Sequence, residues 1–144
     1  LTYGYNTDGG ALAAKVGSIG ESRTLGYQEH GTSGWFTIFI RGMLCNWMVS
    51  MGVVGAMIST SAGSKMAAMW MPVMLFFFMG FEHSIVNMFL FPFSMIMGGE
   101  FTISDYLIWN EIPTVLGNLV GGFLLVGLPL YWTHVRTSAE RKLV

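Results

Sequence analysis

The sequence predicts an all-α integral membrane protein. Of its 144 residues, 53% are hydrophobic and only 10% are charged, and the mean hydropathy is +0.56. Soluble domains carry roughly 25% charged residues. Long apolar runs provide a second indication, because about 20 apolar residues cross a hydrocarbon core of about 30 Å. The formal net charge of −1 gives no electrostatic reason to expect nucleic acid as a partner.

The two ends of the chain are more polar than its middle. Residues 1–33 are glycine-rich with mixed charges, which predicts an extracytoplasmic loop or linker in which 11–19 is long enough for a short helix. Residues 136–144 are predicted to be a tail. The chain begins at Leu1 without a basic, cleavable signal pattern, and we expect it to be a fragment.

A first transmembrane span is predicted over about 35–58, within a three-span membrane domain over 34–135. Its single charged residue, Arg41, lies near the start, where a long side chain reaches the headgroups. Asn46 is a polar amide in an apolar run and needs a hydrogen-bond partner.

The second apolar block, 66–97, is too long for one ordinary span of about 20 residues and too short for two. A polar interruption at 80–84 divides it. We therefore expect one discontinuous span made of two half-helices. Irregular backbone at membrane depth is tolerated only where protein buries it or where it lines a cavity, and broken helices recur in transporters and channels.

The third span is predicted over about 112–135, after an acidic loop over 98–113. It contains a GxxxG pattern at Gly117 and Gly121, which lets transmembrane helices approach closely. With three spans, the first turn and the tail share one side of the membrane. That side has more basic residues, so the positive-inside rule predicts a cytoplasmic C-terminus in a cell-membrane protein.

Two adjacent ionisable residues, Glu82 and His83, occupy the interruption. Ionisable residues inside a span usually face a pore or cavity and act there. Histidine exchanges a proton near neutral pH, and His83 precedes a half-helix whose free N–H groups attract anions. Glu82 is either a member of a proton relay or an acceptor for backbone N–H groups at the break. The phenylalanines around the break include candidates for a hydrophobic constriction.

Other classes of protein have little support in the sequence. Cys45 is the only cysteine, and His30 and His134 lie outside the apolar cores, so we expect neither a metal nor a cofactor. No nucleophile with a separated base is evident, which argues against an enzyme. The alternative is a non-transporting membrane subunit, with Glu82 and His83 as structural or redox-cofactor contacts.

Three separated motifs resemble the formate/nitrite transporter family. They are GFEHSIVNMF at 80–89, RGMLCNWMV at 41–49 and IPTVLGNLVGG at 112–122. Their order is similar to that in the C-terminal half of such proteins, their fourth to sixth spans.

The resemblance implies an aquaporin-like inverted-repeat bundle, of which this chain supplies one three-span repeat, and a homopentamer of full-length chains. Each subunit would transport small monovalent anions such as formate or nitrite, linked to protons through His83. Phe76 matches a constriction residue, and Asn46 and Asn118 match polar residues near the histidine. His30 stands where some members have a vestibule lysine, which leaves Lys15 or Arg23 as substitutes.

Overall fold

The computed structural model describes residues 10–137, and these are helical apart from short connections, with no strand among them. The all-α prediction is confirmed. The helices, in chain order, are α1 (Ala11–Ser22), α2 (Leu25–Gln28), α3 (Gly31–Ile58), α4 (Ala62–Phe78), α5 (Ser84–Ile96), α6 (Ile103–Tyr106), α7 (Ile112–Gly122) and α8 (Leu128–Leu130). Wide, π-helical segments at Leu107–Glu111, Phe123–Gly127 and Tyr131–Arg136 join α6, α7 and α8 into one long helix. The segment before residue 10 and the tail after 137 lie outside the described residues.

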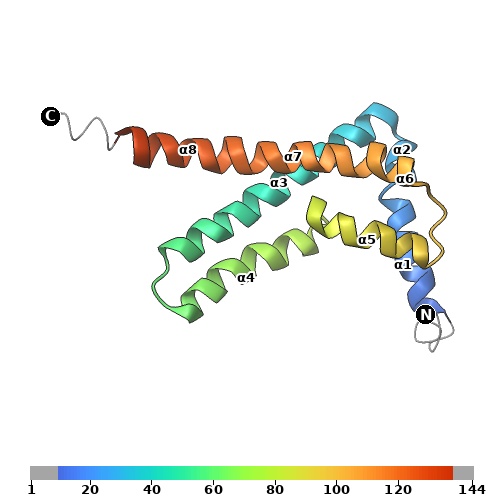
Figure 1. Cartoon of the computed structure of the whole chain (residues 1–144), viewed down its shortest axis with the longest axis horizontal. Coiled ribbons are helices and arrows are strands. Elements are labelled where there is room, and N and C mark those ends of the chain that lie inside the picture. The colour runs from blue at the N-terminus through green and yellow to red at the C-terminus, as the bar shows by residue number, and fades with distance from the viewer. Residues whose placement is uncertain (1–9, 138–144) are drawn as a thin grey trace.

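The long C-terminal helix crosses α3, and α4 runs back beside α3 toward the middle of the molecule (Figure 1). Glycines set the distance between α3 and α7. A Cβ atom on Gly117 or Gly121 would collide with backbone atoms of Phe39 and Met43 on α3, and one on Gly42 would lie 2.9 Å from the Thr114 carbonyl oxygen. The GxxxG pair therefore lies against α3, where the absence of side chains permits close packing.

The second apolar block is interrupted between α4 and α5. Gly80 has a φ of +64°, a left-handed conformation that glycine adopts without steric cost. The Phe81 N–H donates to the Phe76 carbonyl at 3.0 Å, and His83 is extended, with φ −123° and ψ 117°. The chain thus leaves α4 after Phe78 and enters α5 at Ser84.

Helix α1 covers the short helix expected at 11–19 and continues to Ser22. Three other helices, α2, α4 and the last one, begin where loop was predicted, because polar residues expected in loops form or begin helices. The last helix begins at Ile103 rather than 112, because Thr102 and Asp105 form a capping box that satisfies the first backbone N–H groups. Ser61 accepts from the Ser64 N–H at 3.1 Å and starts α4 within the predicted turn.

A small aromatic core holds α5 to the start of the last helix. Phe91 stacks on Tyr106 with ring centroids 4.6 Å apart and meets Phe101 edge-on at 5.7 Å. Helix α1 packs along α5 near this core. The packing of α1 against α5 fixes the position of α1 relative to the break.

Much of the remaining apolar surface is open. Helices Gly31–Ile58 and Ile103–Arg136 are long and apolar enough to cross a membrane, and α4 and α5 are shorter apolar helices. Met57, Ile58 and Phe78 are 77%, 78% and 87% exposed. Exposed apolar surface on this scale requires a cover of lipid or protein.

Candidate functional site

His83 lies at the end of the break, immediately before α5, and is half-buried. Its ring packs on Phe76 of α4, with ring centroids 5.8 Å apart, and Phe76 is itself buried. The His83 Nδ1 atom is buried without a hydrogen-bond partner among residues 10–137. A titratable ring therefore stands beside a buried phenylalanine, with a ring nitrogen that no described side chain uses.

Asn118 of α7 holds the backbone of the break in place. Its Nδ2 donates to the carbonyl oxygens of Glu82 and Gly42, each at 3.0 Å. Its Oδ1 accepts from the Ser84 N–H at 3.2 Å and the Ser84 hydroxyl at 3.3 Å. One side chain thus ties the break to α3 and satisfies an otherwise free N–H at the start of α5.

Asn46 of α3 has the hydrogen-bond partner that its place in an apolar run requires. Its Nδ2 donates to the Asn118 carbonyl oxygen at 2.6 Å. Asn46 therefore braces the backbone of α7 behind Asn118. The partner of this part-buried amide is a main-chain carbonyl.

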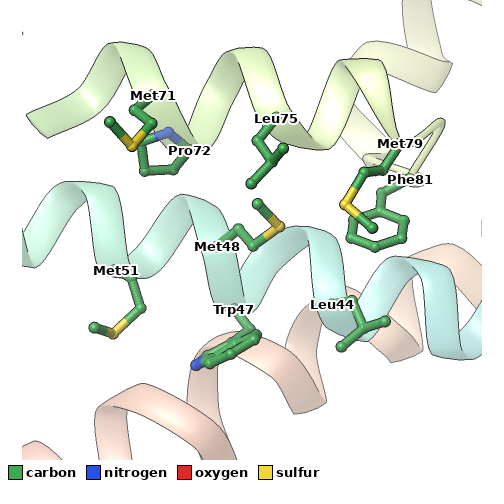
Figure 2. Close-up of a pocket in the computed structure, with 9 residues that line it drawn as sticks. All are labelled: Leu44, Trp47, Met48, Met51, Met71, Pro72, Leu75, Met79 and Phe81. Atoms are coloured by element: carbon green, nitrogen blue, oxygen red, sulfur yellow. The ribbon is translucent and has the colours of Figure 1, made fainter. Parts of the chain in front are cut away.

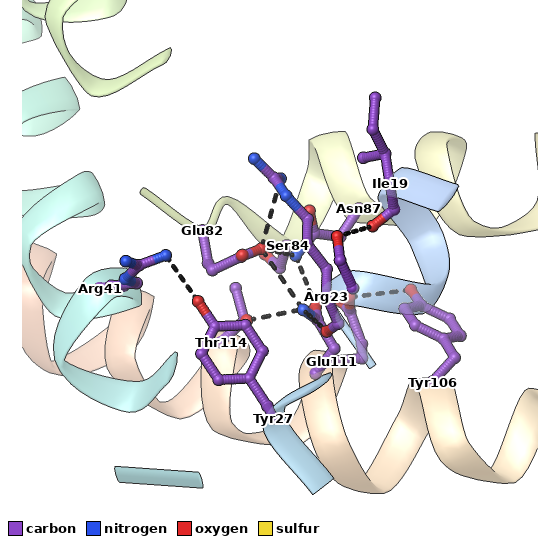
Figure 3. A network of polar contacts seen from close by, with 12 residues as sticks. Ile19, Arg23, Tyr27, Arg41, Glu82, Ser84, Asn87, Tyr106, Glu111 and Thr114 are labelled. Carbon is purple, nitrogen blue, oxygen red and sulfur yellow. Dashed lines mark hydrogen bonds and ion pairs between the residues drawn. The ribbon is translucent and has the colours of Figure 1, made fainter. Parts of the chain in front are cut away.

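Glu82 is fully buried and its carboxylate belongs to a polar network (Figure 3). Its Oε2 accepts from Asn87 Nδ2 at 3.0 Å and from Asn110 Nδ2 at 3.4 Å, and it lies 3.6 Å from Arg23 Nη1. Its Oε1 is buried without a partner in the described part of the chain. The donors that surround the carboxylate are side chains rather than the backbone N–H groups of the break.

Most of this network was not predicted from the sequence. Asn110 lay in the predicted acidic loop, yet it is fully buried and donates to the Arg23 carbonyl at 2.9 Å while accepting from Asn87 at 2.7 Å. The spacing of polar residues in the sequence could have shown that Asn110 lies on a helix. Asn110, Thr114 and Asn118 recur every four residues, which places them on one face of a continuous helix.

A second buried pair extends the polar face of the last helix. The Tyr106 hydroxyl donates to Glu111 Oε2 at 2.8 Å, and both residues are buried. Figure 3 shows this pair on the side of the network away from Arg41, whose guanidinium donates to the Tyr27 hydroxyl. Neither Tyr106 nor the burial of Glu111 was predicted from the sequence.

A cavity of about 220 Å³ opens beside the break. Its lining consists of Ile19, Arg23, Phe76, Phe77, Phe81, His83, Val86, Asn87 and Leu90. Arg23 and His83 are its basic members. His30, the position of interest in the N-terminal segment, precedes α3 and is not among the lining residues.

A larger groove of about 460 Å³ runs between α3 and α4 (Figure 2). It is lined by Leu44, Trp47, Met48, Met51, Met71, Pro72, Leu75, Met79 and Phe81. This lining contains no titratable side chain that could act on an ion. The cavity at His83 is therefore the candidate site, although the groove between α3 and α4 is larger.

An apolar helical exterior, a broken helix and a histidine at the break are typical of α-helical membrane proteins of the channel or transporter class. The chain is similar to a solved pentameric formate channel with formate bound, with a TM-score of 0.76 and 27% identity over 91% of this chain and 56% of that one. A model of the formate/nitrite transporter family matches residues 2–132. The chain belongs to the formate/nitrite transporter family.

Named relatives agree with that assignment. A probable formate transporter of Methanothermobacter thermautotrophicus is 37% identical over 89% of this chain and 43% of its own length. Formate-nitrite transporter 2 of Toxoplasma gondii is 39% identical over 65% of this chain and 20% of its own length. The formate channel FocA of Escherichia coli is 36% identical over 67% of this chain and 40% of its own length. The chain spans less than half the length of each of these relatives. None of their names describes an enzyme.

Proposed function

We propose that the natural full-length protein transports small monovalent anions, such as formate or nitrite, across a cell membrane. The observation that carries the proposal is the position of His83, which lines a cavity at the break between two apolar half-helices and packs on Phe76. The named relatives that transport formate support the choice of anion.

The physical problem for such a protein is the cost of moving a charge through an apolar pore. An isolated carboxylate in a medium of low dielectric is unfavourable by tens of kcal/mol before relaxation. Protonation of a weak-acid anion removes most of that cost. In the proposed mechanism the anion approaches the N-terminus of α5, where free N–H groups favour negative charge, and His83 supplies or stabilises the proton.

The neighbouring residues have separate proposed roles. Phe76 forms the apolar constriction that excludes hydrated ions, while Asn118 and Asn46 hold the break in shape. For Glu82, the contacts with Arg23, Asn87 and Asn110 favour an anchoring role over direct proton transfer within a relay.

The proposed assembly is a homopentamer in the lipid bilayer of the cell membrane, with the C-terminus in the cytoplasm. A pentameric structural relative and the exposed apolar side chains support this assembly. The excess of basic residues beside the first turn and in the tail supports the orientation.

The test is formate uptake by proteoliposomes that contain the full-length protein or its His83→Asn variant, measured from pH 5 to 8. Asparagine keeps a polar side chain of similar reach but cannot exchange a proton near neutral pH. We expect the variant to lose most of the uptake and its pH dependence. A Lys65→Gln variant, changed at an exposed position at the far end of α4, is the control.

Equal uptake and equal pH dependence in His83→Asn would contradict the role of His83 in protonation. No uptake by the wild-type protein, together with haem-like absorbance on purification, would favour the non-transporting membrane subunit instead.

A further inference from the structure

Glu111 is a buried carboxyl group that the proposed mechanism does not use. It ends the π-helical segment Leu107–Glu111, is 6% exposed, and is not among the residues that line the cavity at His83. We propose that Glu111 is a proton-binding site, which holds a proton at neutral pH and keeps the contact between the last helix and α5 uncharged. This inference goes beyond the proposed transport function and does not depend on it.

The hydrogen bonds of Glu111 are too few for an ionised carboxylate. Its Oε2 accepts from the Tyr106 hydroxyl at 2.8 Å, whereas its Oε1 is buried without a partner among residues 10–137. An ionised carboxylate has about four acceptor sites, and burial of an unpaired charge costs far more than burial of a neutral carboxyl group. A proton on Oε1 removes the charge and leaves Oε2 free to accept from Tyr106.

Glu82 shows what the same fold provides for a carboxylate that has a cationic partner. Its Oε2 accepts from Asn87 and Asn110, and Arg23 Nη1 lies 3.6 Å away. Glu111 has no ion-pair partner in the described part of the chain, while Glu82 lies near enough for its charge to act on Glu111. A like charge nearby disfavours ionisation. The single cation of the network therefore pairs with Glu82, and Glu111 is left to bind a proton.

The other titratable groups near Glu111 are engaged elsewhere. The elements that pack on its segment are α2, α3, α5, α6 and α7, and the sequences of α5 and α7 contain no titratable residue. Tyr27 of α2 and Arg41 of α3 hydrogen-bond each other, and Cys45 of α3 is a free, buried thiol. Asp105 of α6 belongs to the capping box of its own helix. None of these groups supplies a positive charge to the Glu111 carboxyl.

The position of Glu111 couples its proton to the packing of the last helix. Its donor Tyr106 stacks on Phe91 of α5 with ring centroids 4.6 Å apart, and the Tyr106–Glu111 pair lies on the side of the polar network away from Arg41 (Figure 3). An exposed glutamate titrates near pH 4.3, so at neutral pH the native protein binds one proton more than the unfolded chain. The resulting stability is complete below about pH 4 and is lost as the pH rises.

The experiment is infrared spectroscopy of the full-length protein at pH 7, which separates the C=O band of a protonated carboxyl group from the bands of ionised carboxylates. Wild type should show such a band, and Glu111→Gln should lose it. Glu100→Gln, which changes an exposed glutamate, is the control and should keep it. If Glu111→Gln keeps every protonated-carboxyl band of the wild type, the inference is overturned.

A second variant covers the case in which Glu111→Gln does not fold. Tyr106→Phe keeps the ring and removes only the hydroxyl that donates to Glu111. The band of Glu111 should therefore shift and remain present, because the carboxyl group loses a hydrogen bond but not its proton. An unshifted set of bands in Tyr106→Phe would overturn the inference.

Thermal unfolding from pH 5 to pH 8 measures the linked stability. The unfolding temperature of the wild type should fall relative to that of Glu111→Gln by on the order of 3 °C per pH unit, as expected for one proton. A difference between the two proteins that does not change with pH would contradict the inference. Formate uptake by Glu111→Gln at pH 7 should equal that of the wild type, so the proposed function is tested separately.

Discussion

At the scale of single residues, the site depends on amides more than on charges. Asn118 connects α7 to the backbone on both sides of the break, and Asn46 supports Asn118 in turn. Buried amides of this kind are costly when a partner is removed, because the remaining donor or acceptor loses its only hydrogen bond. The position of His83 is therefore fixed by uncharged neighbours.

Replacement of Asn118 tests that dependence. Asn118→Ala leaves the Glu82 and Gly42 carbonyls and the Ser84 N–H without their side-chain partner, which should destabilise the protein by on the order of 3 kcal/mol in sum. Asn46→Ala, with one hydrogen bond to the Asn118 carbonyl, is the matched control and should cost about 1 kcal/mol. Thermal unfolding in detergent measures both, and equal losses would contradict the role assigned to Asn118.

At the scale of elements, the close crossing of α3 and α7 sets the frame around the break. It depends on glycines whose missing side chains admit the facing backbone. Because Asn118 lies on α7 between Gly117 and Gly121 and reaches Gly42 on α3, any separation of these helices also moves the residue that holds the break.

Gly121→Ala should force the helices apart. Its Cβ would overlap the Met43 carbonyl, and overpacking of a tight contact costs on the order of 1–3 kcal/mol. Gly63→Ala on α4, where nothing lies within 4 Å of the added carbon, is the control and should be neutral or slightly stabilising because alanine favours helix. The comparison uses thermal unfolding and formate uptake. Unchanged stability of Gly121→Ala would show that the crossing can relax.

At the scale of the whole molecule, the open apolar surface must be covered. The exposed side chains of α3 and α4 and the apolar groove between these helices have no counterpart in a stable soluble monomer. Lipid and neighbouring protein are the covers that the proposed pentamer provides.

The proposed assembly can be measured directly. Light scattering of the full-length protein in mild detergent should give a protein mass about five times that of one subunit, as expected if it assembles like its pentameric structural relative. A mass of one or two subunits would contradict the pentamer. It would leave the proposal for His83 intact, because His83 and Phe76 belong to one chain.

The sequence by itself determined the helical class and the family, and it predicted an interruption near 80–84 and a role for His83. The helical class and the interruption follow from local composition. Apolar runs of span length form helices in a membrane, and ionisable residues inside such a run usually have a function. Only the tertiary structure decided what surrounds the break. Arg23, Glu82 and Asn110 lie far apart in the chain, and no local pattern shows that they meet, because such a contact depends on how α1 and the last helix pack around α5.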